Sequence, residues 1–132
     1  MIKPSKVQGL RHVALKVRDL EACTRFYTEV IGMQVEWQPD IDNVYLTSGT
    51  DNLALHRTQE ALLGEGQRLD HIGFILTTPQ AVDDWYPFLV EQGVKILTLP
   101  KTHRDGARSL YCQDPDGNAV QFIYHPPLAD FA

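Results

Sequence analysis

Leu110-Tyr-Cys-Gln-Asp-Pro-Asp-Gly-Asn-Ala-Val-Gln-Phe-Ile-Tyr124 is the stretch that decides the fold, and it predicts two strands joined by a tight turn. Pro115 presets φ for the second position of a type I turn, Asp114 can accept a backbone hydrogen bond at the first, and Gly117 suits the last. Side chains alternate between the two faces of a strand, so Gln121 faces away from its large apolar neighbours. We therefore expect Gln121 to meet other polar groups.

Two histidines in earlier strands are the candidates to meet Gln121. The strand predicted over 10–17 carries His12 on its polar face, and the strand predicted over 70–76 carries His71 near its start. In a further strand, over 53–57, Ala54 and His56 share one face while leucines take the other.

The chain repeats one pattern twice, which is strand, helix and then three strands. His12 corresponds to His71, and Ala54 corresponds to Gln121. We expect one domain over 1–132, made of a first module at about 9–57, a linker at 58–69 and a second module at about 70–125. Each half is too small to bury enough surface alone, so the modules should pair.

Capping residues and glycines set the expected element bounds. The first half predicts a helix from Leu20 to Ile31 with Asp19 as its cap and Gly32 as its stop, a strand over 33–37, a turn from Pro39 to Asp42 and a strand over 44–47. The second half predicts a helix capped by Thr78 and ended by Gly93, a strand over 94–99, a loop from Pro100 to Ala107 and an irregular tail from Pro126.

Composition excludes several classes of protein. The 132 residues are 43% hydrophobic and 22% charged, as in ordinary globular domains. A net charge of −5 argues against a nucleic-acid binder, and no apolar run approaches a membrane span. Cys23 and Cys112 have no disulfide or zinc spacing, so we expect buried thiols. The first six residues lack the apolar core of a signal peptide, so we expect a cytoplasmic protein.

The sequence resembles the vicinal oxygen chelate superfamily, which includes glyoxalase I, extradiol dioxygenases, and fosfomycin- and bleomycin-resistance proteins. The resemblance extends from Gly9 to Tyr124. It rests on Leu-Arg-His-Val-Ala-Leu-Lys-Val at 10–17, Phe-Tyr in the first helix, Asp-His-Ile-Gly-Phe at 70–74 and the Asp-Pro-Asp-Gly turn. It implies an α+β fold in which two βαβββ modules pair into a half-barrel cup around a divalent metal. Members commonly dimerise, so we expect a homodimer.

Carried over by this resemblance, the metal ligands are His12, His71 and Gln121. Gln121 stands where the superfamily usually has glutamate, and Ala54 stands at a fourth position that is a ligand in glyoxalase I. Two imidazoles and a carboxylate suit non-haem Fe(II). An amide leaves the charge of the metal uncompensated and disfavours a higher oxidation state, so Zn, Mn, Ni or Co in a Lewis-acid role would suffer less.

Within the superfamily, the pattern around the final hairpin is most similar to that of the single-iron extradiol dioxygenases. Their signature is matched by His103, Tyr111 and the Asp-Pro-x-Gly turn, and this chain departs from it at Gln121, where that family has glutamate. The resemblance implies that Tyr111 and His103 hydrogen-bond the substrate. His56 resembles a pocket histidine of the family and would act as general acid and base, because an unperturbed imidazole titrates near neutral pH. The substrate would be a small molecule, a catechol with dioxygen for ring cleavage, or an enediolate-forming adduct for a lyase or isomerase.

A metal-free alternative stays open at this point. The chain could be a ligand-binding protein of the bleomycin-resistance kind, with strand histidines bonded to backbone carbonyls. Gln121 could equally bond a helix end or a dimer partner, Tyr111 could be a pocket wall and His103 a solvated turn residue. The sequence also leaves open whether His12, His71 and Gln121 meet in one subunit or across two.

Overall fold

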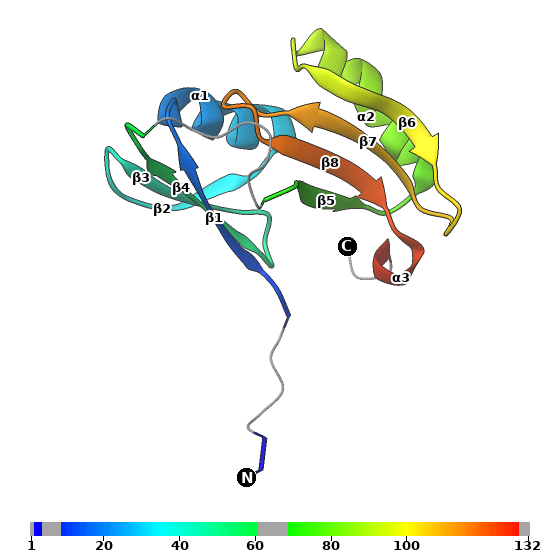
Figure 1. Ribbon diagram of the computed structural model, residues 1–132, viewed down its shortest axis with the longest axis horizontal. Helices are drawn as coiled ribbons and strands as arrows, with labels where there is room; N and C mark the ends of the chain where they lie inside the picture. Colours follow the sequence, from blue (N-terminus) through cyan, green and yellow to red (C-terminus); the bar gives the residue numbers. More distant parts are fainter. Residues whose placement is uncertain (1, 4–8, 61–68, 130–132) are drawn as a thin grey trace.

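Two four-stranded sheets, each with its own helix, form the framework of the chain (Figure 1). A computed structural model describes residues 2–3, 9–60 and 69–129. The first sheet has the strand order β1-β4-β3-β2 and the second β5-β8-β7-β6. The strands are β1 His12–Val17, β2 Gln34–Asp40, β3 Asn43–Thr47, β4 Asn52–Arg57, β5 Ile72–Leu76, β6 Ile96–Thr102, β7 Arg108–Gln113 and β8 Ala119–Tyr124.

The pairing register of the two sheets confirms the predicted repeat. The first strand of each module pairs in parallel with the last, so that Ala14 lies opposite Ala54 and Gly73 lies opposite Gln121. The middle strands pair antiparallel in both modules. The predicted α+β fold of two βαβββ modules is therefore confirmed, and the two sheets do not close on each other, which is consistent with a cup.

The first helical segment begins after Asp19 and ends at Gly32 as predicted, but its second half differs in type. Asp19 caps it, with its Oδ1 accepting from the amide of Ala22 at 3.0 Å. The prediction of one regular helix was wrong, because α1 Leu20–Arg25 gives way to a π-helical segment, η1 Phe26–Ile31. Two consecutive aromatic residues, Phe26 and Tyr27, are both buried there. The wider π turn brings both rings toward the core, which a single α-helical stripe does less readily.

Two prolines that were expected in a turn and a loop lie inside strands instead. Pro39 belongs to β2 and Pro100 to β6, and each of these strands lies at one edge of its sheet. An edge strand needs no N–H on its outer side, so proline is tolerated there. The register breaks at both prolines, between Trp37 and Asp40 and between Thr98 and Lys101. The repeat thus extends to a proline bulge in each module.

The remaining elements differ from expectation mainly at their ends. The second helix, α2 Pro79–Glu91, has the predicted Thr78 cap. β5 begins at Ile72, so His71 precedes the strand. The tail from Pro126, predicted as irregular, forms a short helix, α3 Pro126–Ala129. Most of the linker predicted over 58–69 falls outside the described residues.

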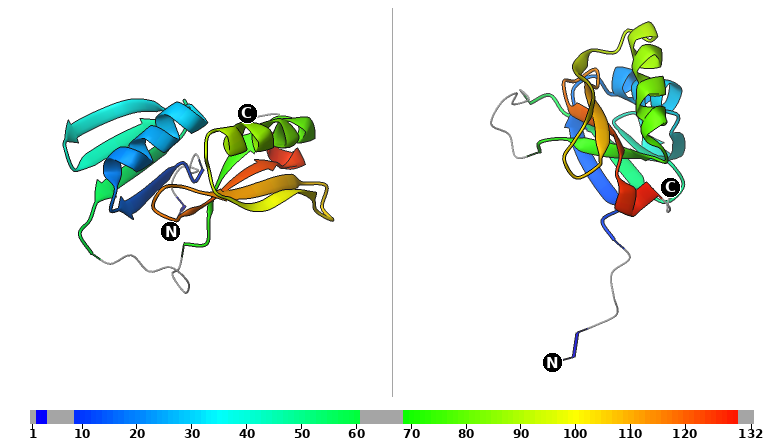
Figure 2. Two further views of the ribbon diagram at one scale, coloured as in Figure 1. Left: turned by 90° about the horizontal axis from the view of Figure 1, so that it is seen from above. Right: turned by 90° about the vertical axis from the view of Figure 1, so that its right-hand side faces the viewer.

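The main helices lie on the same side of the two sheets, and the opposite faces are left largely uncovered (Figures 1 and 2). We call the face of each sheet opposite its helix the open face. The buried apolar cluster lies between sheets and helices and takes residues from both modules. Within the described part of the chain, no helix is long and apolar enough to cross a membrane.

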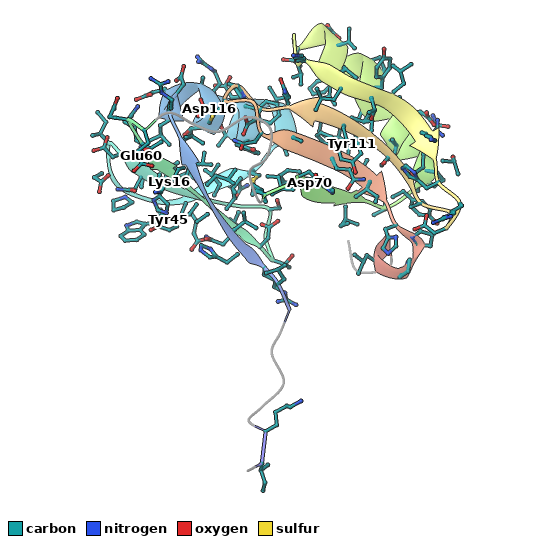
Figure 3. All side chains as sticks on the ribbon, in the orientation of Figure 1. Lys16, Tyr45, Glu60, Asp70, Tyr111 and Asp116 are labelled. Atoms are coloured by element: carbon teal, nitrogen blue, oxygen red, sulfur yellow. The ribbon has the colours of Figure 1, made fainter. Side chains whose placement is uncertain are left out.

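The turn between β7 and β8 also ties the two modules together. Gly117 donates to the carbonyl of Asp114 at 3.0 Å, which confirms the predicted turn. Asp114, only 3% exposed, accepts from the Tyr27 hydroxyl at 2.8 Å. Asp116 accepts from the backbone amides of Arg18 and Asp19 where α1 begins (Figure 3). The final hairpin of one module therefore holds the helix of the other.

The two buried thiols make stability sensitive to alkaline pH. Burial raises the pKa of the Cys112 thiol from 9.0 to about 12, with the charge of Asp114 adding to the effect. Burial also raises the pKa of Cys23. A raised pKa in the folded state means that the stabilisation is complete below the unfolded pKa and is lost as pH rises above it.

We expect the free energy of unfolding to fall above pH 9 by up to about 1.4 kcal/mol per pH unit for each thiol. Cys112→Ala should give a shallower slope, which urea titrations at a series of pH values will measure. An equal slope in the variant and the parent would contradict the burial argument.

Candidate functional site

The second open face gathers most of the predicted site residues around one hollow. In the β7–β8 register Tyr111 lies opposite Gln121. The Gln121 side chain is 8% exposed and has no hydrogen-bond partner within the described residues. Tyr111, Gln121 and His103 together line a cavity of about 610 Å³. Because no described residue is hydrogen-bonded to this amide and the side chain lines the cavity, its polar atoms are available to a ligand there.

Tyr111 connects this hollow to His71. The two rings meet edge to face with centroids 5.1 Å apart. Partial burial, helped by the negative charge of Asp70, raises the pKa of Tyr111 above 10. The phenol therefore keeps its proton at neutral pH and serves as a hydrogen-bond donor. Figure 3 places Asp70 and Tyr111 together on the second module.

His103 lies in the turn between β6 and β7, at one end of the hollow. Its Nε2 lies 2.9 Å from the hydroxyl of Ser109. Its backbone N–H donates to the carbonyl of Ala107 at 2.7 Å, which closes the turn. His103 thus reaches the cavity from a fixed turn, and its Nε2 already has a protein partner.

His12 and His56 lie apart from this group, on the open face of the first sheet. His12 pairs with Asn52 across β1 and β4, and His56 pairs with Lys16 further along, so the two imidazoles stand roughly 13 Å apart along the strands. Among the described residues no group of three or more His, Cys, Asp or Glu side chains is placed to bind a metal. The six predicted site residues are therefore divided between the two sheets.

The protonation of His12 follows from its hydrogen bonds. The Asn52 amide donates through Nδ2 to the Glu36 carboxylate at 2.8 Å, because an ionised carboxylate can only accept. The amide oxygen of Asn52 then faces Nδ1 of His12 at 2.7 Å. An oxygen acceptor at this distance requires a proton on Nδ1, so the neutral imidazole has Nε2 unprotonated.

His56 and His71 also have an oxygen acceptor next to Nδ1, as His12 does. Asn43 donates through Nδ2 to Asp40 at 2.9 Å and presents its amide oxygen to Nδ1 of His56 at 2.6 Å. His71 has its Nδ1 2.6 Å from the Asp70 carboxylate. All three histidines therefore have Nδ1 engaged by an oxygen, which leaves Nε2 as the nitrogen that can bind a ligand.

For His12 and His71 this pattern is the one that metal-binding histidines have, although the two residues belong to different sheets. A histidine that binds a metal usually donates its other ring N–H to a carboxylate or carbonyl oxygen, which fixes the tautomer and the ring orientation. The Gln121 amide can add an oxygen donor. Brought together, two neutral nitrogens and one neutral oxygen would suit a borderline metal, without a protein charge to offset it.

The derived tautomers make a prediction that can be measured without a metal or a substrate. In Asn43→Ala, His56 should lose its preference for a proton on Nδ1 and shift toward the Nε2–H form that free imidazoles favour, while His12 stays unchanged. Long-range ¹H–¹⁵N NMR on the neutral imidazoles distinguishes the two forms. Asn52→Ala is the reciprocal control and should change His12 alone. A His56 tautomer that does not respond to Asn43→Ala would refute the assignment.

Sequence reasoning missed Tyr45, which is the repeat partner of Tyr111. Tyr45 lies opposite Ala54 in the β3–β4 register, as Tyr111 lies opposite Gln121. Its ring meets that of His56 edge to face at 5.8 Å and stacks on Trp37 at 5.2 Å. Alignment of the two modules strand by strand would have found it, because each tyrosine precedes its aligned partner by nearly the same number of residues.

Comparison with known proteins identifies relatives along nearly the whole chain. Residues 9–122 match the family model described as "Glyoxalase/Bleomycin resistance protein/Dioxygenase superfamily". Over 127 residues the chain is 26% identical to 1,2-dihydroxynaphthalene dioxygenase of Sphingobium xenophagum, a match that covers 94% of this chain but 41% of that protein. Over 116 residues it is 25% identical to metallothiol transferase FosB of Staphylococcus saprophyticus, which covers 87% of this chain and 76% of that one.

Solved structures show the same fold. The structure of lactoylglutathione lyase from Agrobacterium tumefaciens superposes with a TM-score of 0.76, over 91% of this chain and 96% of that one. Sequence identity in that match is 22%, so the structural similarity supports the fold alone.

Proposed function

Because the chain belongs to the glyoxalase/bleomycin resistance protein/dioxygenase superfamily, we propose that it is a metal-dependent enzyme acting on a small, oxygen-rich substrate, with extradiol ring cleavage as its reaction. The observation that carries the proposal is the Gln121 amide, 8% exposed, unpartnered among the described residues and open to the cavity that Tyr111 and His103 also line. A relative named as a dioxygenase and another named as a metallothiol transferase support a metal-dependent reaction.

His12, His71 and Gln121 would hold the metal. When bound, the metal would supply Lewis-acid stabilisation to two neighbouring oxygens of the substrate. Fe(II) would serve ring cleavage of a catechol, and Zn, Mn, Ni or Co would serve a lyase or isomerase. Nδ1 of His12 is engaged by Asn52 and Nδ1 of His71 by Asp70, so each imidazole offers Nε2.

The chain's own polar groups supply the remaining roles. Tyr111 donates its phenolic proton to a substrate oxygen, because its raised pKa keeps it protonated. His56, with its proton on Nδ1, can accept a proton at Nε2 and acts as general base and then general acid. His103 closes the end of the cavity and orients the substrate there.

A homodimer is part of the proposal. The predicted ligands are divided between two sheets, and large apolar side chains are exposed on both edge strands, with Trp37 at 58% on β2 and Leu99 at 63% on β6. A second copy would cover such surface and could bring one first sheet against the second sheet of its partner.

Elemental analysis tests the metal. Protein purified without an affinity tag, before and after dialysis against a chelator, should contain about one equivalent of a divalent metal per chain. His12→Ala and His71→Ala should lower metal affinity by more than about a hundredfold while circular dichroism stays unchanged. His125→Ala, the remaining histidine, is the matched control and should keep the metal. Iron would point to oxygen consumption with catechols, and zinc or nickel to a lyase or isomerase.

A metal-free binding protein is the second candidate. It is favoured by the absence, among the described residues, of any group of three classical ligand side chains, and by an amide where a carboxylate would neutralise a metal. Unchanged metal content in His71→Ala, or no uptake after reconstitution, would leave this candidate standing and refute the enzyme.

A further inference from the structure

The cavity beside Gln121 has positive charges at its rim. Lys101 and Arg104 both line it and both are exposed. Neither has an acidic partner within the described residues, whereas Arg57 pairs with Glu21 and Arg108 pairs with Asp83. Asp105 also lines the cavity, so the three charged side chains leave it net positive in a chain whose net charge is −5.

The repeat shows that this charge is specific to the second module. Lys101 lies opposite Ser109 in the β6–β7 register, and Asp40 lies opposite Asn43 at the matching place of the first module. The matching positions thus carry opposite charges. In the first module Asp40 accepts from Asn43 and so orients His56, while in the second module the cation is left for another partner.

Two neutral hydrogen-bond donors also line the same cavity. Tyr111 offers its O–H and Gln121 its NH₂ group. Two of the acceptors that line the cavity already have a donor, because the Thr102 hydroxyl accepts from Arg108 at 2.9 Å and Oδ1 of Asp105 accepts from the amide of Ala107 at 3.0 Å. The cavity therefore offers two donors beside the two cations, while the Asp105 carboxylate and the amide oxygen of Gln121 are the acceptors that remain in its lining.

We propose that this cavity binds the carboxylate of an anionic substrate, with Lys101 and Arg104 at the carboxylate and Tyr111 and Gln121 beneath it. A planar carboxylate matches the paired N–H groups of an arginine and gains from a lysine nearby. The substrate is then a small acid that carries its reacting oxygens on the side away from the turn. This inference rests on the proposed function for the identity of the site, and it adds the charge of the molecule that binds there.

Benzoate and benzamide form a pair of probes that test the inference without a metal or a turnover. They have nearly the same shape and differ in charge. Titrated into the chelator-treated protein in an anion-poor buffer, benzoate should shift the NMR signals of the Gln121 side-chain amide and the Tyr111 ring, and should bind about tenfold more tightly than benzamide. In Lys101→Met/Arg104→Met the preference for benzoate should disappear.

A matched control separates this local effect from net charge. Arg25→Met/Lys95→Met removes the same charge from exposed positions outside the cavity lining and should retain the tenfold preference. Equal binding of the two probes, no binding of benzoate, or a preference that survives Lys101→Met/Arg104→Met would overturn the inference. None of these results depends on metal content. The carboxylate site can therefore fail while the metal-dependent reaction, which elemental analysis tests, is upheld.

Discussion

Replacing Asp114 with alanine is expected to lower the free energy of unfolding by about 3–5 kcal/mol. The carboxylate is 3% exposed and accepts four hydrogen bonds. Two come from the backbone amides of Asp116 and Asn118, one from the Asn118 side chain and one from the Tyr27 hydroxyl. Alanine removes both acceptor oxygens and with them all four hydrogen bonds, and it leaves a fully buried phenol without a partner, which alone costs about 1–3 kcal/mol.

Tyr27→Phe provides the matched control for that loss. It removes one donor and leaves Asp114 with its other three, so we expect a cost of about 1–2 kcal/mol. In the double variant the orphaned hydroxyl no longer exists, so its cost should be smaller than the sum of the two single costs by about 1–2 kcal/mol. Urea unfolding followed by tryptophan fluorescence measures all three. Strict additivity would show that the 2.8 Å contact contributes nothing to stability.

The same substitution should loosen the contact between the modules. Asp114 and Asp116 belong to the hairpin of the second module, and their partners Tyr27, Arg18 and Asp19 belong to the first. We therefore expect amide hydrogen exchange in α1 to rise more than in α2 when Asp114 is replaced, since α2 lies within the hairpin's own module.

Side-chain alternation and the internal repeat predicted two paired modules of one helix and four strands, and the family resemblance supplied the cup into which they pair. The faces of Gln121 and of the histidine-bearing strand His12–Val17 followed from a period of two, and the turn at Asp114 followed from its residue types. The sequence did not reveal the strand order. Pro39 and Pro100 were therefore read as strand ends, although an edge strand accommodates both.

From the sequence, the site residues could be assigned to a face of the first or the second sheet, but the two sets could not be placed relative to each other. Each sheet determines which of its residues share a face, but the packing of one sheet against another depends on contacts spread over the whole core. The carboxylate–amide–histidine chains were missed for a related reason. Glu36 and Asp40 lie on the edge strand of the sheet, and nothing local in the sequence links them to His12 or His56.

Gln121→Glu is expected to change stability in opposite directions with and without metal. In the metal-free protein the new carboxylate replaces an amide that is 8% exposed and has no partner among the described residues, so the free energy of unfolding should fall by about 1–3 kcal/mol. With metal present the same charge offsets part of the +2 charge that two imidazoles and an amide leave uncompensated. Affinity for Zn²⁺ should then rise by about a hundredfold, which corresponds to about 2.7 kcal/mol.

Thermal unfolding with and without Zn²⁺ measures both effects on one protein. A ligand that binds only the folded state stabilises it by an amount that grows with the logarithm of the ligand concentration divided by its Kd. Gln38→Glu makes the same change of charge at an exposed position on β2 and should alter neither value by more than about 0.5 kcal/mol. A Gln121→Glu protein that loses stability without metal and regains it with Zn²⁺ would place this side chain at the metal. A loss of stability both with and without Zn²⁺ would show that Gln121 does not bind the metal. Its amide would then be expected to contact only the substrate.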